Sequence, residues 1–191
     1  MAPGYAPNAQ TLLGRDATIA RFLHDAPTSS IIHIAAHSVF DMEAPFRSFI
    51  HLAPSAMDSG KLYAHDLVTR FRAGQTRLVV LSSCSSAGGG PVGPEGVAPL
   101  VRPLIAEGVP AVIGSLWDVK DPTAEMLLVS FHQHYRNGDD AAVALRKAQI
   151  EMLRKNKDAS VTSPTAWGAF QVIGHGSSPF ASAPQPKEKP P

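Results

Sequence analysis

The stretch RLVVLSSCSSAGGG, residues 77–90, decides how the rest of this sequence is interpreted. Its first half is a short continuous apolar run, which is typical of a strand that is buried on both faces of a sheet. Its second half is rich in serine and glycine and predicts a loop whose backbone can approach a ligand closely. Cys84 stands where the strand gives way to the loop, so we expect its thiol at the edge of the sheet rather than in the core.

Further apolar runs lie on both sides of this stretch. Residues 31–36, 111–116 and 169–173 each indicate a buried strand, and residues 46–52 indicate a further strand or part of a hairpin. Segments of helical character alternate with them: 14–25, 62–71, 95–107, 121–136 and 139–155. Alternation of this kind predicts an α/β fold with a mostly parallel sheet that is covered on both faces.

The domain organisation follows from where these patterns begin and end. We expect an N-terminal extension over residues 1–11, one folded domain over 12–175, and a disordered tail rich in proline and serine over 176–191. The length of 191 residues suits one compact domain with a substantial core. No internal repeat is evident.

Charge and composition exclude several classes of function. The 17 basic and 16 acidic residues leave a net charge of +1, which gives no electrostatic basis for binding nucleic acid or an anionic membrane. No apolar run approaches the roughly 20 residues that a membrane span needs. The first ten residues lack the basic and apolar regions of a signal peptide. Because Cys84 is the single cysteine, no internal disulfide can form, and we expect a reducing, cytoplasmic setting.

Three unusual loops follow the predicted parallel strands. His37 comes after the first strand, Cys84 after the second, and Trp117-Asp118 after the third. Parallel sheets bind ligands at the carboxyl ends of their strands, where these loops meet. If the first two strands are neighbours, His37 and Cys84 project from the same edge. A nearby imidazole could then take the thiol proton, and loop amides could stabilise an oxyanion.

Five segments together resemble the CHAT domain family, which comprises caspase-like cysteine peptidases related to separase. The segments run in the family's order: HIAAHS (33–38), LVVLSSCSSAGGG (78–90), EGVAPLVRPLIAEGVPAVIGSLWDVKD (95–121), ALRKAQIEM (144–152) and SPTAWGAFQVIG (163–174). They span roughly residues 12–174. One departure is that Ser38 stands where the family usually has glycine.

This resemblance implies a caspase-like three-layer αβα sandwich with a mostly parallel sheet. It implies His37 as general base, Cys84 as nucleophile, and the backbone amides of Ser38 and Cys84 as the oxyanion hole. A protein or peptide would be the substrate, and a regulatory domain such as tetratricopeptide repeats would be a partner. No cofactor is implied.

The loop after the third strand is the candidate substrate pocket. Asp121 precedes Pro122 and has the pattern of a helix N-cap, which leaves Asp118 without such a duty. Asp118 resembles the acidic residue of separase that faces a basic side chain before the cut, so cleavage after arginine or lysine is one expectation. The competing interpretation is an apolar pocket lined by residues such as Trp117.

Other kinds of site fit the sequence less well. His33 and His37 would lie roughly 13 Å apart on a strand, too far to share a metal ion, and His33 reads as a core histidine. The glycine-rich loop lacks the lysine of a phosphate-binding P-loop. We therefore expect neither a metal nor a cofactor. Besides an endopeptidase, a catalytically silent module that binds a partner protein and an acyltransferase on the same dyad remain as alternatives.

Overall fold

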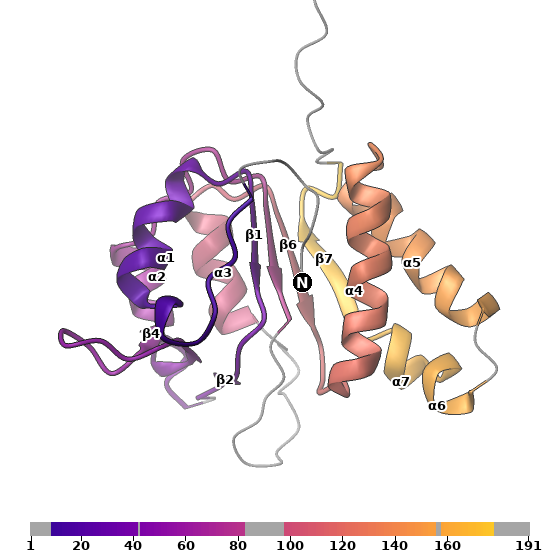
Figure 1. The fold of residues 1–191 in the computed structure, drawn as a ribbon, viewed down its shortest axis with the longest axis horizontal. Coiled ribbons are helices and arrows are strands. Elements are labelled where there is room, and N and C mark those ends of the chain that lie inside the picture. The colour runs from indigo at the N-terminus through magenta and orange to yellow at the C-terminus, as the bar shows by residue number, and fades with distance from the viewer. Residues whose placement is uncertain (1–8, 42, 83–97, 156–157, 178–191) are drawn as a thin grey trace, which may run out of the picture.

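A four-stranded sheet forms the centre of the protein in the computed structural model, which describes residues 9–41, 43–82, 98–155 and 158–177 (Figure 1). Its strands are β1 (Ile31–Ile34), β5 (Leu78–Leu81), β6 (Ala111–Ser115) and β7 (Phe170–Gly174), in the order β1-β5-β6-β7. The first three are parallel and β7 runs antiparallel to β6. The sheet is therefore mostly parallel, as the sequence predicts.

Helices cover both faces of this sheet (Figure 1). One face carries α1 (Ile19–Asp25), α2 (Ala64–Thr69) and α3 (Ala98–Ala106), and the other carries α4 (Asp121–Arg136) and α5 (Ala141–Lys155). The short helices α6 (Ala159–Thr162) and α7 (Pro164–Trp167) lead from α5 into β7. The result is a three-layer αβα sandwich, which confirms the predicted fold class.

The two apolar cores follow from the alternation of side chains along the strands. On β5, Val79 and Leu81 enter the core with α1–α3, whereas Leu78 and Val80 enter the core with α4 and α5. All four side chains have no exposed surface. A continuous apolar run is thus what a central strand between two helical layers requires.

A second, smaller sheet lies beyond the carboxyl end of β1. It is antiparallel, in the order β2 (Ser38–Val39), β3 (Phe49–His51) and β4 (Lys61–Tyr63), and η3 (Pro45–Arg47) lies between its first two strands. The sequence predicted β3 but assigned residues 62–71 wholly to a helix. The helix begins at Ala64 instead, because Leu62 pairs with Ile50 and both enter the core.

The start of α4 differs from the prediction by one residue. Asp121 is the first residue of the helix, and Lys120 occupies the N-cap position without a side-chain bond. The N-cap assignment of Asp121 was therefore wrong, although Pro122 lies in the first turn, where its missing N–H costs nothing. Within the described residues, none of the helices has the length and apolar character to span a membrane.

The predicted tail lies almost entirely outside the described residues, which end at Ser177. At its start, the Gly176 carbonyl accepts a hydrogen bond of 3.2 Å from the amide of Ala142 in the first turn of α5. The chain therefore keeps contact with the sandwich for at least one residue beyond the predicted end of the domain.

Candidate active site

The carboxyl ends of β1 and β5 lie side by side at the same level. The two strands are parallel neighbours with Ile34 opposite Leu81, and the amide of Ser82 donates a 2.9 Å hydrogen bond to the Ile34 carbonyl. His37 follows Ile34 by three residues, and Cys84 follows Leu81 by three residues. The register thus places the strand ends that precede the two candidate catalytic residues at the same edge of the sheet.

The structure describes His37 but not Cys84, which lies in the segment 83–97 outside the described residues. The side chain of His37 is exposed. Its carbonyl accepts a 2.7 Å hydrogen bond from the amide of His51, which fixes the backbone between β1 and the small sheet. A general base needs an accessible ring on a held backbone, and His37 meets both conditions.

The hydrogen-bond pattern of the small sheet sets the direction of the Ser38 backbone amide. His37 and His51 are joined by a ladder hydrogen bond, so Ser38 and Ile50 form the next, non-hydrogen-bonded pair of the antiparallel ladder. The N–H of Ser38 therefore points away from β3. An outward amide beside the candidate base is the geometry that an oxyanion donor needs.

The side chain of Ser38 points into the core. It has no exposed surface, and its Oγ has no hydrogen-bond partner within the described part of the chain. Ile50 and Leu62 share its face of the small sheet and are also fully buried. A serine can thus occupy the position with its side chain turned into the core and its amide turned outward.

The candidate pocket residues follow β6 as predicted. Trp117 keeps 37% of its surface exposed, while its indole Nε1 donates a 2.8 Å hydrogen bond to the Thr165 carbonyl at α7. Asp118 is exposed and the next residue, Val119, is buried against α4 and its neighbours. Because β5 lies between β1 and β6, the strand that precedes Cys84 ends between the strands that lead to His37 and to this pair.

His33 does not occupy the core, and the expectation of a core histidine was wrong. Its side chain is exposed on β1, which is one of the two edge strands of the sheet in the described residues. It lies on the same side of the sheet as α4, where its Nδ1 lies 3.0 Å from Nε2 of His132. Sequence reasoning missed this pair because 99 residues separate its members and periodicity does not show which strand is an edge.

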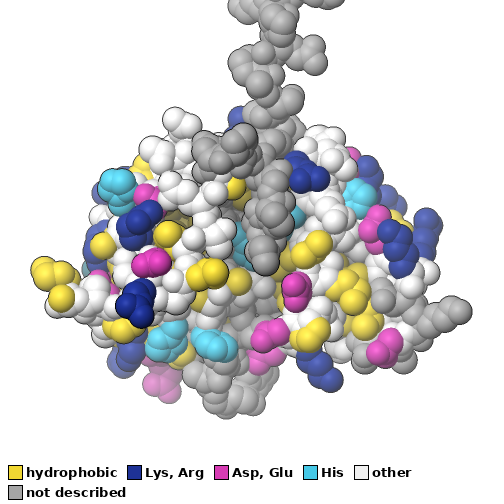
Figure 2. All heavy atoms as spheres, in the orientation of Figure 1, with side chains coloured by type: hydrophobic (Ala, Val, Ile, Leu, Met, Phe, Trp, Pro, Cys, Tyr) yellow, Lys and Arg dark blue, Asp and Glu magenta, His cyan; other side chains and the backbone are white. Residues whose placement is uncertain are grey.

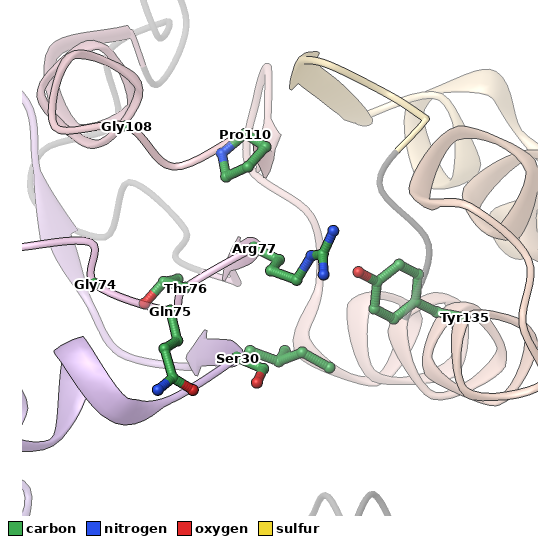
Figure 3. Close-up of a pocket in the computed structure, with 9 residues that line it drawn as sticks. Ser30, Gly74, Gln75, Thr76, Arg77, Gly108, Pro110 and Tyr135 are labelled. Carbon is green, nitrogen blue, oxygen red and sulfur yellow. The ribbon is translucent and has the colours of Figure 1, made fainter. Parts of the chain in front are cut away.

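A pocket of about 560 Å³ lies at the opposite end of the sheet (Figure 3). Its lining includes Ser30, Arg77 and Pro110, each of which comes directly before a strand of the parallel sheet. This pocket is therefore remote from the carboxyl edge and takes no part in the candidate site. Across the described ranges, no group of three or more His, Cys, Asp and Glu side chains could hold a metal ion.

Comparison with known proteins supports the fold. A family model described as the CHAT domain matches residues 2–175. Among solved structures, the chain resembles the Arg-specific cysteine proteinase gingipain R, with a TM-score of 0.56 and 11% sequence identity. The likeness covers 85% of this chain but 36% of that proteinase, so it supports the fold alone. A search of curated proteins found no match.

Proposed function

Because the chain belongs to the CHAT domain family, whose fold is that of caspase-like cysteine peptidases, we propose that it is a cysteine endopeptidase with His37 and Cys84 as its dyad. The observation that carries this proposal is the register of β1 and β5, which starts the two loops from the same level of one sheet edge.

The reaction uses each residue in a distinct way. His37 takes the thiol proton, and the Cys84 thiolate attacks the peptide carbonyl carbon. The backbone amides of Ser38 and Cys84 bind the resulting oxyanion. His37 then gives its proton to the departing amine, which leaves a thioester on Cys84. Water, deprotonated by His37, hydrolyses the thioester and restores the thiol.

The pocket for the residue before the cleaved bond lies at Trp117 and Asp118. A carboxylate there favours arginine or lysine, and the exposed part of the indole offers an apolar wall for the aliphatic stem. Gingipain R is described as Arg-specific, and we extend the same preference to this chain as part of the proposal.

Setting and partners belong to the same proposal. A single thiol that must stay reduced suits the cytoplasm. The substrate is a protein or peptide, and a regulatory domain such as tetratricopeptide repeats is the partner that the family suggests.

A catalytically silent module that binds a partner is the second candidate, and Ser38 is the observation that favours it. Serine replaces the family's glycine next to the base, and its buried hydroxyl stands unsatisfied in the described part of the chain. In that case the edge would hold a peptide without cleaving it.

Labelling of Cys84 by a peptide acyloxymethyl ketone separates the two candidates. The wild type should gain the mass of one peptidyl group, the Cys84→Ala variant should gain none, and the His37→Ala variant should react more slowly by about 10²–10⁴-fold. His24→Ala, an exposed histidine on α1, is the matched control and should label at the wild-type rate. Equal rates in the His37→Ala and His24→Ala variants would remove His37 from the mechanism.

A further inference from the structure

The strand order assigns the two halves of a bound substrate to different sides of the nucleophile. β5 lies between β1 and β6, so the nucleophile's loop starts between the β6 loop and the small sheet that follows β1. The acyl half of the substrate stays on Cys84 and lies towards Trp117 and Asp118. The amine half receives its proton from His37 and so departs on the side of β2. This division of the substrate rests on the proposed function.

The outer face of the small sheet begins at His37. Side chains on one face alternate along each strand, and directly opposite residues share a face. The register therefore places His37, His51 and Lys61 in one row across the three strands. A second row on this face consists of Val39, Phe49 and Tyr63.

These two rows form a compact aromatic and basic surface. The ring of Phe49 lies 4.8 Å from that of His51 and 5.4 Å from that of Tyr63, measured between centroids. The Lys61 ammonium lies 5.0 Å from the Phe49 centroid. His51 is exposed and the other three are half-buried, so the surface is open to a ligand. Histidine side chains are visible in Figure 2 at the lower edge, where β2 and β4 lie in Figure 1.

No acidic side chain of the described ranges forms an ion pair with the basic residues of this surface. Within those ranges neither His51 nor Lys61 forms an ion pair. The carboxylates in the segments that adjoin these strands contact turn amides, hydroxyls or arginines: Asp41, Asp58 and Asp66. The Lys61 ammonium gives this surface, which begins at the proton donor to the leaving amine, a positive charge that can receive an acidic segment of the substrate.

We infer that the outer face of β2–β4 binds the substrate segment that follows the cleaved bond and selects an acidic residue at its second or third position. The spacing sets these positions. Adjacent strands lie about 4.8 Å apart, so His51 is roughly 5 Å and Lys61 roughly 10 Å from His37 along the row. An extended peptide advances about 3.3 Å per residue, which brings its second residue level with His51 and its third level with Lys61.

Cleavage of a random peptide mixture, read by mass spectrometry, tests this selectivity. In the wild type, Glu and Asp should exceed Gln and Asn about fivefold at the second or third position after the cut, as expected for one half-exposed charge pair. The Lys61→Met variant should lose this preference at the third position. Lys147 lies on α5 and forms an ion pair with Asp139. Lys147→Met is therefore the control for loss of a lysine and should keep the preference.

A binding measurement keeps the surface testable if the chain cleaves nothing. The full-length Cys84→Ala variant is mixed with two fluorescein-labelled peptide pools that are identical except for Glu or Gln at every third residue. The Glu pool should bind about fivefold more tightly, and Lys61→Met on the same background should equalise the pools. Absence of a Glu preference in both assays, or its persistence after Lys61→Met both at the third position and in the binding assay, would overturn the inference. Loss of cleavage and of Cys84 labelling with the binding preference intact would instead refute the peptidase proposal.

Discussion

Nδ1 of His33 lies 3.0 Å from Nε2 of His132, and this contact joins the edge strand β1 to the helix α4. The two rings are tilted by 33° with their centroids 5.0 Å apart. Burial lowers the pKa of His132 to about 3, and the neighbouring His33 adds to the effect. Desolvation likewise lowers the pKa of His33 to about 4. Both imidazoles are therefore neutral at pH 7 and can share one N–H···N hydrogen bond.

This pair predicts an acid-sensitive stability. In the unfolded chain both histidines titrate near pH 6.5, whereas in the folded chain they stay neutral down to about pH 4 and pH 3. Between these values the unfolded state binds more protons, so the contribution is complete above pH 6.5 and is lost as the pH falls towards 4. We expect the melting temperature of the wild type to drop over this range.

The His132→Gln variant isolates the effect from the titration of carboxylates. Glutamine can still donate to His33 but does not titrate, so its melting temperature should fall less between pH 6.5 and pH 4 than that of the wild type. His134→Gln on the same helix, where His134 contacts Glu151, serves as the control for loss of a histidine. If the melting temperatures of the wild type and His132→Gln fall in parallel as the pH is lowered, the histidine pair does not cause the acid sensitivity.

The sequence predicts those parts of the fold that carry a strong repeating pattern. β5 is recognisable in the sequence because all four of its residues are apolar, as a strand buried on both faces requires. α5 is recognisable because its apolar residues recur at helical spacing. The small sheet is weaker in sequence because its strands have only two or three residues and depend on Ile50 and Leu62 packing into the core. The hydrophobic pattern therefore predicts the central sheet and its helices better than it predicts the small sheet β2–β4.

The candidate site shows the same limit. His37 could be placed from its position after a strand, because parallel strands end at one edge. The sequence did not predict His132 as the partner of His33, because their contact depends on how α4 packs against the edge strand β1. The outward direction of the Ser38 amide also required the register of the ladder.

Ser38 carries a stability cost that a substitution can relieve. Its hydroxyl is fully buried without a hydrogen-bond partner in the described residues, and an unsatisfied group of this kind costs about 1–3 kcal/mol. The Ser38→Ala variant keeps the backbone amide and removes the hydroxyl, so its free energy of unfolding in urea should rise by about 1 kcal/mol. Ser48→Ala is the contrast, because the Ser48 Oγ accepts a hydrogen bond from the Asp41 amide. A loss of stability in Ser38→Ala would mean that the hydroxyl has a partner.

Gly60 closes the loop between β3 and β4 in a conformation that other residues rarely adopt. Its φ is +76°, and a Cβ there would collide with the backbone of Leu52, Ala53 and Pro54. Gly60→Ala should therefore lower the melting temperature and disturb the row that contains Lys61. Gly14→Ala is the matched control, since Gly14 also has a positive φ, +53°, but open space around its Cβ position. Equal losses for the two variants would indicate that only the backbone angle matters, not the collision.

The charge of Asp118 should set the residue that precedes the cleaved bond. Asp118 is exposed just past β6, beside Trp117, whose indole is tied to α7 through Thr165. A fixed ring and an adjacent carboxylate suit arginine, because the ring packs on the aliphatic stem and the carboxylate accepts from the guanidinium fork. Fluorogenic peptides that differ only at this position should show kcat/KM highest for Arg, then Lys, and lower for Gln and Leu.

The Asp118→Asn variant separates this pocket from an apolar one. Loss of a charge-assisted hydrogen bond worth about 1.5 kcal/mol should lower kcat/KM for the Arg peptide about tenfold and leave the Leu peptide unchanged. Glu125→Gln removes a negative charge from the exposed side of α4 and should alter neither value. If the wild type instead prefers Leu or Met, or if Asp118→Asn keeps its preference for Arg, Trp117 and its apolar neighbours define the pocket, and the carboxylate has only a local role in the turn that precedes α4.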